Sequence, residues 1–194
     1  MPELGQTGQS VLPGAATEGP IAIRTHGMQG MVTIKADLST PLTTAALAQA
    51  MGTDMPPPRA IVTGTLGKIA WMAPDEILVL CAHGDADAVV AVASNALAGQ
   101  HHLAVNVSDA RAMFELTGPR GAIRDAMAKI TPADMSIAGV PIDTLRRTRL
   151  AQVPGAFWFE DDETLHLICF RSVAGYVFEL LQMSAAPDGA VGYY

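Results

Sequence analysis

The sequence predicts an α+β protein built from two pseudo-symmetric ferredoxin-like halves. Segments typical of strands and helices follow one another in the same order twice. Trp71 is followed five positions later by Glu76, and Trp158 is followed five positions later by Glu163. A cysteine comes ten residues after the first tryptophan and eleven after the second. Several strands are apolar on both faces, so both sides must be covered, which places the helices outside the sheets.

The first half begins with an apolar run rich in β-branched residues at 31–36, which indicates a strand. A helix is predicted next, because Thr40 is a suitable N-cap and Pro41 takes the first helical position, where its missing N–H costs nothing. Gly52 and the prolines at 56–58 end this helix. A hairpin, a further strand and a second helix complete the half, at residues 60–65, 68–72, 76–82 and 85–98.

The second half repeats this order after a connecting strand at residues 103–107. A strand at 112–116 leads to a helix that begins at Pro119. Ser172 is predicted to cap the last helix, whose apolar residues recur with helical spacing. Three strands are predicted between these two helices, at residues 144–151, 155–159 and 164–170.

The two ends of the chain differ in composition from the part between them. Residues 1–20 are rich in Gly, Gln, Pro and Thr and cannot bury enough apolar surface to fold alone, so we expect a flexible or partner-bound tail. Residues 185–194 have the same character and are expected to form a C-terminal tail. Between them, residues 21–184 are predicted to form a single domain made of two halves, at about 30–99 and 103–184.

The composition is apolar and poor in charge. Apolar residues make up 49% of the chain and charged residues 16%, against about 25% charged in an average soluble domain. The mean hydropathy is +0.27. General enrichment in Ala and Val would explain this, and so would a surface that is partly covered by another chain.

Charge and hydropathy also exclude some classes of partner. The net charge of -7 argues against nucleic acid, whose phosphates require a basic face. No apolar run reaches the roughly 18–20 residues that cross a bilayer, so no membrane association is expected. The N-terminus contains Glu3 and lacks the basic and apolar regions of a signal peptide, which predicts a cytoplasmic location.

No residue is predicted to be catalytic, to bind a cofactor or to hold a metal ion. The sequence contains no Gly-x-Gly-x-x-Gly, the turn on which a dinucleotide pyrophosphate binds. His101 and His102 are neighbours on a predicted strand and therefore point to opposite faces, which does not suit a metal site. Residues 160–163, Glu-Asp-Asp-Glu, could suggest a cation site, but their place between two apolar strands favours the exposed tip of a hairpin.

Two arginines remain as candidates for binding a ligand or a partner, and two cysteines as candidates for a disulfide or a reactive thiol. Arg147 and Arg149 lie two residues apart on a predicted strand and so share one face. They could bind a carboxylate-bearing ligand or an acidic patch of a partner, or pair with acidic groups of this chain. Cys81 and Cys169 each lie in an apolar run without a basic neighbour, which favours reduced, buried thiols over a disulfide or a reactive thiol.

Three segments of the chain resemble the gamma subunit of heterotetrameric sarcosine oxidase, a relative of the glycine-cleavage T protein. The first is Ile-Ala-Trp-Met-Ala-Pro-Asp-Glu-Ile-Leu-Val-Leu at 69–80. The second is Val-Ser-Asp-Ala-Arg-Ala-Met-Phe-Glu-Leu-Thr-Gly-Pro-Arg at 107–120, which also resembles the wider T-protein group. The third joins Arg-Arg-Thr-Arg-Leu-Ala at 146–151 to Phe-Arg-Ser-Val-Ala-Gly-Tyr at 170–176. With their spacing, these segments cover most of residues 30–184.

The resemblance implies a fold like the folate-binding domains of the T protein and a function in a larger enzyme. The implied complex demethylates sarcosine oxidatively to glycine, forms hydrogen peroxide and passes a one-carbon unit to tetrahydrofolate. The implied role of this chain is that of a non-catalytic structural subunit without a cofactor. The alpha, beta and delta subunits would be its partners, and FAD, FMN, NAD and tetrahydrofolate would bind to them. The alternative is a stand-alone folate-binding or aminomethyltransferase-like protein.

Overall fold

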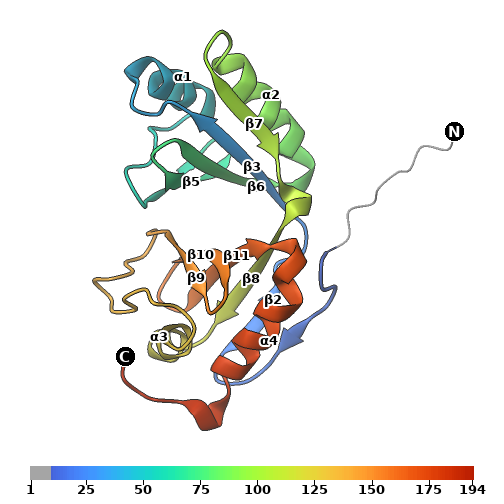
Figure 1. The fold of residues 1–194 in the computed structure, drawn as a ribbon, viewed down its shortest axis with the longest axis vertical. Coiled ribbons are helices and arrows are strands. Elements are labelled where there is room, and N and C mark those ends of the chain that lie inside the picture. The colour runs from blue at the N-terminus through green and yellow to red at the C-terminus, as the bar shows by residue number, and fades with distance from the viewer. Residues whose placement is uncertain (1–9) are drawn as a thin grey trace, which may run out of the picture.

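Two antiparallel sheets stack face to face in the middle of the protein, and a pair of helices covers the outer side of each (Figure 1). The computed structural model describes residues 10–194. The helices are α1 (Pro41–Met51), α2 (Ala86–Ala96), α3 (Arg120–Ala128) and α4 (Ala174–Ser184). The strands are β1 (Ala16–Thr17), β2 (Ala22–Thr25), β3 (Gln29–Ala36), β4 (Ile61–Gly64), β5 (Gly67–Ala73), β6 (Glu76–Ala82), β7 (His102–Asn106), β8 (Arg111–Thr117), β9 (Arg146–Leu150), β10 (Val153–Phe159) and β11 (Thr164–Phe170).

The two halves have the same topology, which confirms the predicted α+β fold of two pseudo-symmetric halves. The first half runs β3-α1-β4-β5-β6-α2 and the second runs β8-α3-β9-β10-β11-α4. The strand orders correspond as well, with β4-β5-β6-β3 in one sheet and β9-β10-β11-β8 in the other. Each half therefore builds a four-stranded core sheet and covers one face of it with two helices.

Each sheet is completed by a strand that precedes the opposite half in the sequence. β7 lies directly before β8 but pairs with β3 of the first sheet, and β2 lies directly before β3 but pairs with β8 of the second. β1 adds to β2 at the edge. The division at about residue 103 is therefore not the boundary between the sheets, because the strand at 102–106 belongs to the first. This reciprocal exchange links the halves through their backbones.

The core has three layers of buried apolar side chains. One layer lies between the first sheet and α1 and α2, and another between the second sheet and α3 and α4. The third lies between the two sheets. Alternate residues of β6 and β11 contribute to different layers, as expected for strands that are covered on both faces.

Helix ends agree with the sequence in part. Pro41 begins α1, and Gly52 ends it with a φ of 69°, a conformation that glycine adopts without strain. The Thr40 hydroxyl donates to the Asp37 carboxylate at 2.9 Å instead of capping the helix. Ser172 does not cap α4, because residues 171–173 form a 3₁₀ turn and Val173 is the N-cap.

Both predicted tails contain ordered contacts in the described part of the chain. Residues 10–20, assigned above to the N-terminal tail, include β1, while residues 1–9 lie outside the described residues. At the other end, the backbone N–H groups of Gly192, Tyr193 and Tyr194 donate to the carboxylate of Asp125 on α3. None of the helices described here has the length and apolar character needed to cross a bilayer.

Candidate functional site

The contact between the two sheets is the most distinctive feature of this architecture. Its centre is apolar and includes Met31 and Leu80 from the first sheet with Trp158 and Ile168 from the second. Trp158 is only 1% exposed. Burial of this layer stabilises the pairing of the halves, because removing apolar surface from water contributes about 25 cal/mol per Å².

Ion pairs connect the halves at two sides of this apolar layer. On one side, the Lys68 ammonium on β5 pairs with the Glu160 carboxylate in the turn after β10. On the other, the Arg147 guanidinium on β9 lies 3.5 Å from the Glu76 carboxylate on β6, which also lies 3.6 Å from the Lys35 ammonium. Glu76 is only 5% exposed. Burying a carboxylate so deeply is costly unless it has partners of opposite charge, and these two cations are its partners.

A small cavity of about 60 Å³ lies beside the Glu76–Arg147 pair. Arg111 and Arg147 line it, together with the apolar residues Ile168 and Phe170. The Arg111 guanidinium lies over the Phe170 ring, 5.8 Å from its centroid. Burial is the main cause that lowers the pKa of Arg111; Glu76 opposes this shift and Arg147 adds to it. Two guanidinium groups at one opening could bind a carboxylate of a ligand or of a partner chain.

The structure confirms the shared face of Arg147 and Arg149, because both are exposed while their neighbours along β9 are more buried. Arg147 pairs with Glu76, which was one of the two predicted uses of these arginines. Arg149 donates to the Ala151 carbonyl at 3.2 Å. Among residues 10–194 Arg149 forms no ion pair, so its exposed guanidinium could bind an acidic partner.

The hairpin tip at residues 160–163 is also confirmed, since this segment joins β10 to β11. Glu160, however, is more than a solvated residue. Its carboxylate binds both Lys68 and the His166 ring Nε2. The hydrogen bond from Lys68 is the largest cause that lowers the pKa of Glu160. Burial lowers the pKa of His166, which favours the neutral ring.

His102 is the first residue of β7 and His101 precedes the strand; the His102 Nδ1 lies 2.9 Å from the Gln100 carbonyl oxygen. A different set of potential metal ligands does come together on the second sheet, namely His26, Glu115 and His166. Sequence reasoning missed this set because its members come from three distant segments. The burial of Glu76 and the partial burial of Arg111 could not be predicted either, since they depend on the packing of one sheet on the other.

Cys81 and Cys169 are both free and buried, as predicted. Burial raises the pKa of both thiols, that of Cys169 to about 12. At pH 8 a thiol with this pKa is ionised in only about one molecule in ten thousand, and the thiolate is the reactive form. We expect a thiol-specific chromogenic reagent to modify Cys169 only when the protein unfolds. Rapid labelling of Cys169 in the native protein, located by peptide mass spectrometry, would contradict this.

The geometry defines a class of protein: an α+β chain of two like halves whose sheets pack face to face, with ion pairs between the halves beside this apolar contact. The model of the family "Sarcosine oxidase, gamma subunit family" matches residues 35–187. The chain therefore belongs to the sarcosine oxidase gamma subunit family, which confirms the resemblance seen in the sequence.

Individual proteins agree with this assignment. The sarcosine oxidase subunit gamma of Corynebacterium sp. (strain P-1) is 29% identical over 126 residues, which cover 64% of this chain and 60% of that protein. The chain thus matches less than two thirds of the length of this relative. The solved heterotetrameric sarcosine oxidase from Corynebacterium sp. U-96, in complex with pyrrole 2-carboxylate, contains a similar chain, with a TM-score of 0.78, 20% identity and coverage of 91% of this chain and 90% of that one.

A structure that is less similar in sequence also shares the fold. The glycine cleavage system aminomethyltransferase T from Bartonella henselae matches with a TM-score of 0.62 and 12% identity, over 82% of this chain and 45% of that one. At this identity the likeness concerns the fold alone. It confirms that the chain folds like part of a T protein.

Proposed function

We propose that this chain is the gamma subunit of a heterotetrameric sarcosine oxidase and has a structural, non-catalytic role in sarcosine catabolism. The match of the gamma subunit family to residues 35–187 carries this proposal. The complex would demethylate sarcosine oxidatively to glycine, with hydrogen peroxide and a one-carbon unit for tetrahydrofolate as further products. The pairing of Lys68 with Glu160 and of Arg147 with Glu76 supports a structural role, because these charges stabilise the fold itself.

The proposal includes the partners, the cofactors and the location. The alpha, beta and delta subunits would bind this chain and would hold FAD, FMN, NAD and tetrahydrofolate, while this chain would contribute no catalytic or cofactor-binding residue. Its domain would be the segment 21–184 made of two halves. We place the complex in the cytoplasm, where two free cysteines such as Cys81 and Cys169 remain reduced.

Coexpression with a flavin-bearing partner tests the proposal. A tag on this chain should recover a complex that absorbs light as a flavoprotein does and oxidises sarcosine with release of hydrogen peroxide. Elution of the chain as a soluble monomer, with the flavoprotein in a separate peak, would refute the proposal.

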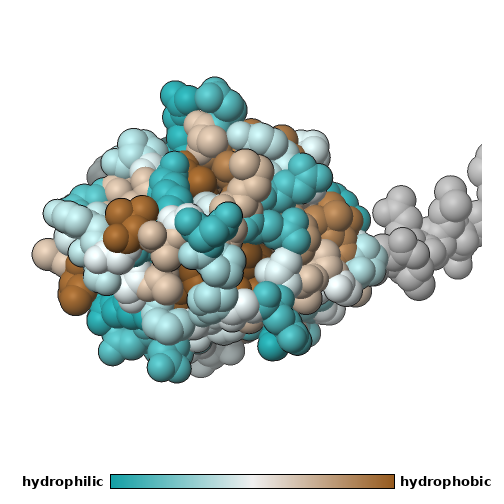
Figure 2. Space-filling view, turned by 90° about the horizontal axis from the view of Figure 1, so that it is seen from below, coloured by the Kyte–Doolittle hydropathy of each residue, from teal (hydrophilic) through white to brown (hydrophobic). Residues whose placement is uncertain are grey.

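The surface offers a charged face and scattered apolar side chains for docking. Figure 2 shows the end of the molecule formed by the second half, where hydrophobic residues form small patches separated by hydrophilic ones. That end therefore lacks the continuous apolar surface typical of obligate interfaces. We place the docking surface on the face of β9 that carries Arg147 and Arg149, because Arg149 is exposed and the chain is otherwise acidic.

Reversal of the charge of Arg149 tests this docking surface. The Arg149→Glu variant should bind the flavoprotein about tenfold more weakly, because a carboxylate would face the acidic groups that the arginine binds. Arg147→Glu in the same chain should weaken binding further. Arg59→Glu is the matched control, since Arg59 is exposed on the first half and the variant has the same net charge. Equal affinities of Arg149→Glu and Arg59→Glu for the flavoprotein would exclude this face.

A further inference from the structure

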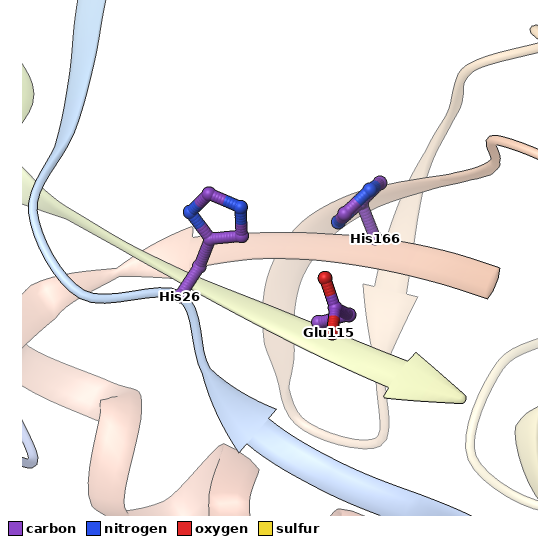
Figure 3. Close-up of side chains that lie close together, drawn as sticks. All are labelled: His26, Glu115 and His166. Carbon is purple, nitrogen blue, oxygen red and sulfur yellow. The ribbon is translucent and has the colours of Figure 1, made fainter. Parts of the chain in front are cut away.

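We propose that His26, Glu115 and His166 bind a divalent transition-metal ion of the zinc type. One potential ligand atom of each residue lies within 4.8 Å of those of the other two, and Figure 3 shows the three side chains around a common space. His26 follows β2, Glu115 is on β8 and His166 is on β11. Two imidazoles and one carboxylate suit zinc and similar ions, whereas calcium and magnesium prefer oxygen ligands. The sequence alone predicted no metal site.

One ring nitrogen of His166 is buried without a hydrogen-bond partner in the described part of the chain. His166 is 5% exposed, and its Nε2 is paired with the Glu160 carboxylate. Because a carboxylate only accepts hydrogen bonds, Nε2 is the protonated nitrogen and the neutral ring leaves a lone pair on Nδ1. That Nδ1 is buried and has no hydrogen-bond partner among residues 10–194. In Figure 3 one ring nitrogen of His166 points toward His26 and Glu115, into the space where an ion would be bound.

Glu160 completes an arrangement that is common around zinc. A histidine that binds zinc with one nitrogen usually donates its other N–H to a carboxylate, which fixes the tautomer and makes the ring a better ligand. Glu160 has this position relative to His166, and the Lys68 ammonium holds the Glu160 carboxylate from the other half. A solvated hairpin residue would not need either contact. The contact between Glu160 and His166 is explained if Nδ1, the other ring nitrogen of His166, binds an ion.

The ligands can reach zinc with small movements. Zn–N bonds of about 2.0–2.1 Å in a tetrahedral site place ligand atoms about 3.3 Å apart, so the three side chains must approach one another by at most about 1.5 Å. The His26 backbone N–H donates to the Met113 carbonyl at 2.9 Å and holds this residue beside β8. The His26 side chain is exposed and can adjust its rotamer. The fourth position of the ion would face the solvent on the side of His26 and hold water.

Metal titration of the full chain tests the proposal directly. The protein would be dialysed against a chelator and then titrated with Zn²⁺ by calorimetry and with Co²⁺ by visible absorption. We expect saturation at one ion per chain, the absorption spectrum of low-coordinate cobalt, and a Tm that rises with added Zn²⁺. The absence of saturable binding in the unmodified chain would overturn the proposal.

Variants locate the ion. His26→Ala should lower the affinity at least tenfold and abolish the rise in Tm, without unfolding the protein, because His26 is exposed. Glu160→Gln, which removes the carboxylate behind His166, should lower the affinity about 10–100-fold. His101→Ala is the matched control, since it removes an exposed histidine just before β7 and should change nothing. An unchanged affinity in His26→Ala, or a loss confined to His101→Ala, would refute the site. No partner chain is needed, so the result is separate from that of the assembly experiment.

Discussion

Replacement of Trp158 by alanine is expected to lower the free energy of unfolding by about 3–5 kcal/mol. The indole is almost fully buried between the two sheets, in one apolar layer with Met31 and Ile168. It also packs on the His166 ring, with 5.3 Å between the ring centroids. Its Nε1–H has no hydrogen-bond partner in the described part of the chain, so the variant loses packing and no hydrogen bond. The sheets cannot close over the resulting cavity, because each is also held by its own helix layer.

The measurement is thermal unfolding of the full chain, in which a loss of this size lowers Tm by about 6–20 °C for a chain of this length. Trp71→Ala is the control. Trp71 is half-buried and lines an open groove on the first half, so we expect this variant to lose only about 1 kcal/mol. A loss of only about 1 kcal/mol in Trp158→Ala, the size typical of a half-buried position, would show that the contact between the sheets contributes little to stability.

The different surroundings of the two tryptophans show where the sequence repeat was misleading. Trp71 pairs with Ile77 in the first sheet, whereas Trp158 pairs with His166 in the second. Ile77 belongs to the layer under the helices, while Trp158 belongs to the layer between the sheets. The two tryptophans are therefore offset by one residue, and in a strand an offset of one changes the face. The spacing from tryptophan to cysteine, ten residues in the first half and eleven in the second, already indicated this offset.

The elements themselves could be predicted because their signals are local. The predicted strands at 76–82 and 164–170 coincide with β6 and β11, and Pro41 and Gly52 mark the ends of α1. The exchange of β2 and β7 between the sheets could not be predicted. These strands are short, and which sheet each one joins depends on contacts with distant residues rather than on their own pattern.

The contacts of the polar groups between the sheets could not be predicted from the sequence, for the same physical reason. Glu76 is the first residue of a strand, and its sequence neighbours do not reveal that it is 5% exposed beside Arg147. His166 occupies a strand position that alternation assigns to one face, without showing that Glu160 lies behind it and Glu115 beside it. Local patterns assign a residue to a face of a strand. Only the packed fold shows which charges and nitrogens share that face.

Replacement of Arg124 by methionine is expected to destabilise the protein by about 3 kcal/mol or more, because a buried carbonyl left without a partner costs about 1–3 kcal/mol. Arg124 on α3 is 1% exposed. Its guanidinium donates to the carbonyls of Met135, Ser136 and Val140, the last at 2.8 Å, and lies 4.4 Å from the centroid of the Phe159 ring. Methionine keeps most of the apolar volume but none of the donors.

The three carbonyls belong to the segment between α3 and β9. In Arg124→Met we therefore expect this segment to lose order as the protein loses stability. We expect Arg124→Met to unfold at a lower urea concentration and to be cleaved by a protease within residues 129–145, where the unmodified chain resists. Arg120→Met is the control, since Arg120 lies on the same helix and over the same Phe159 ring but pairs with the exposed Asp162, and a pair with an exposed partner contributes about 0–1 kcal/mol. If Arg124→Met and Arg120→Met unfolded alike, the connection between α3 and β9 would be held by its apolar residues. Arg124 would then contribute through its contact with Phe159 alone.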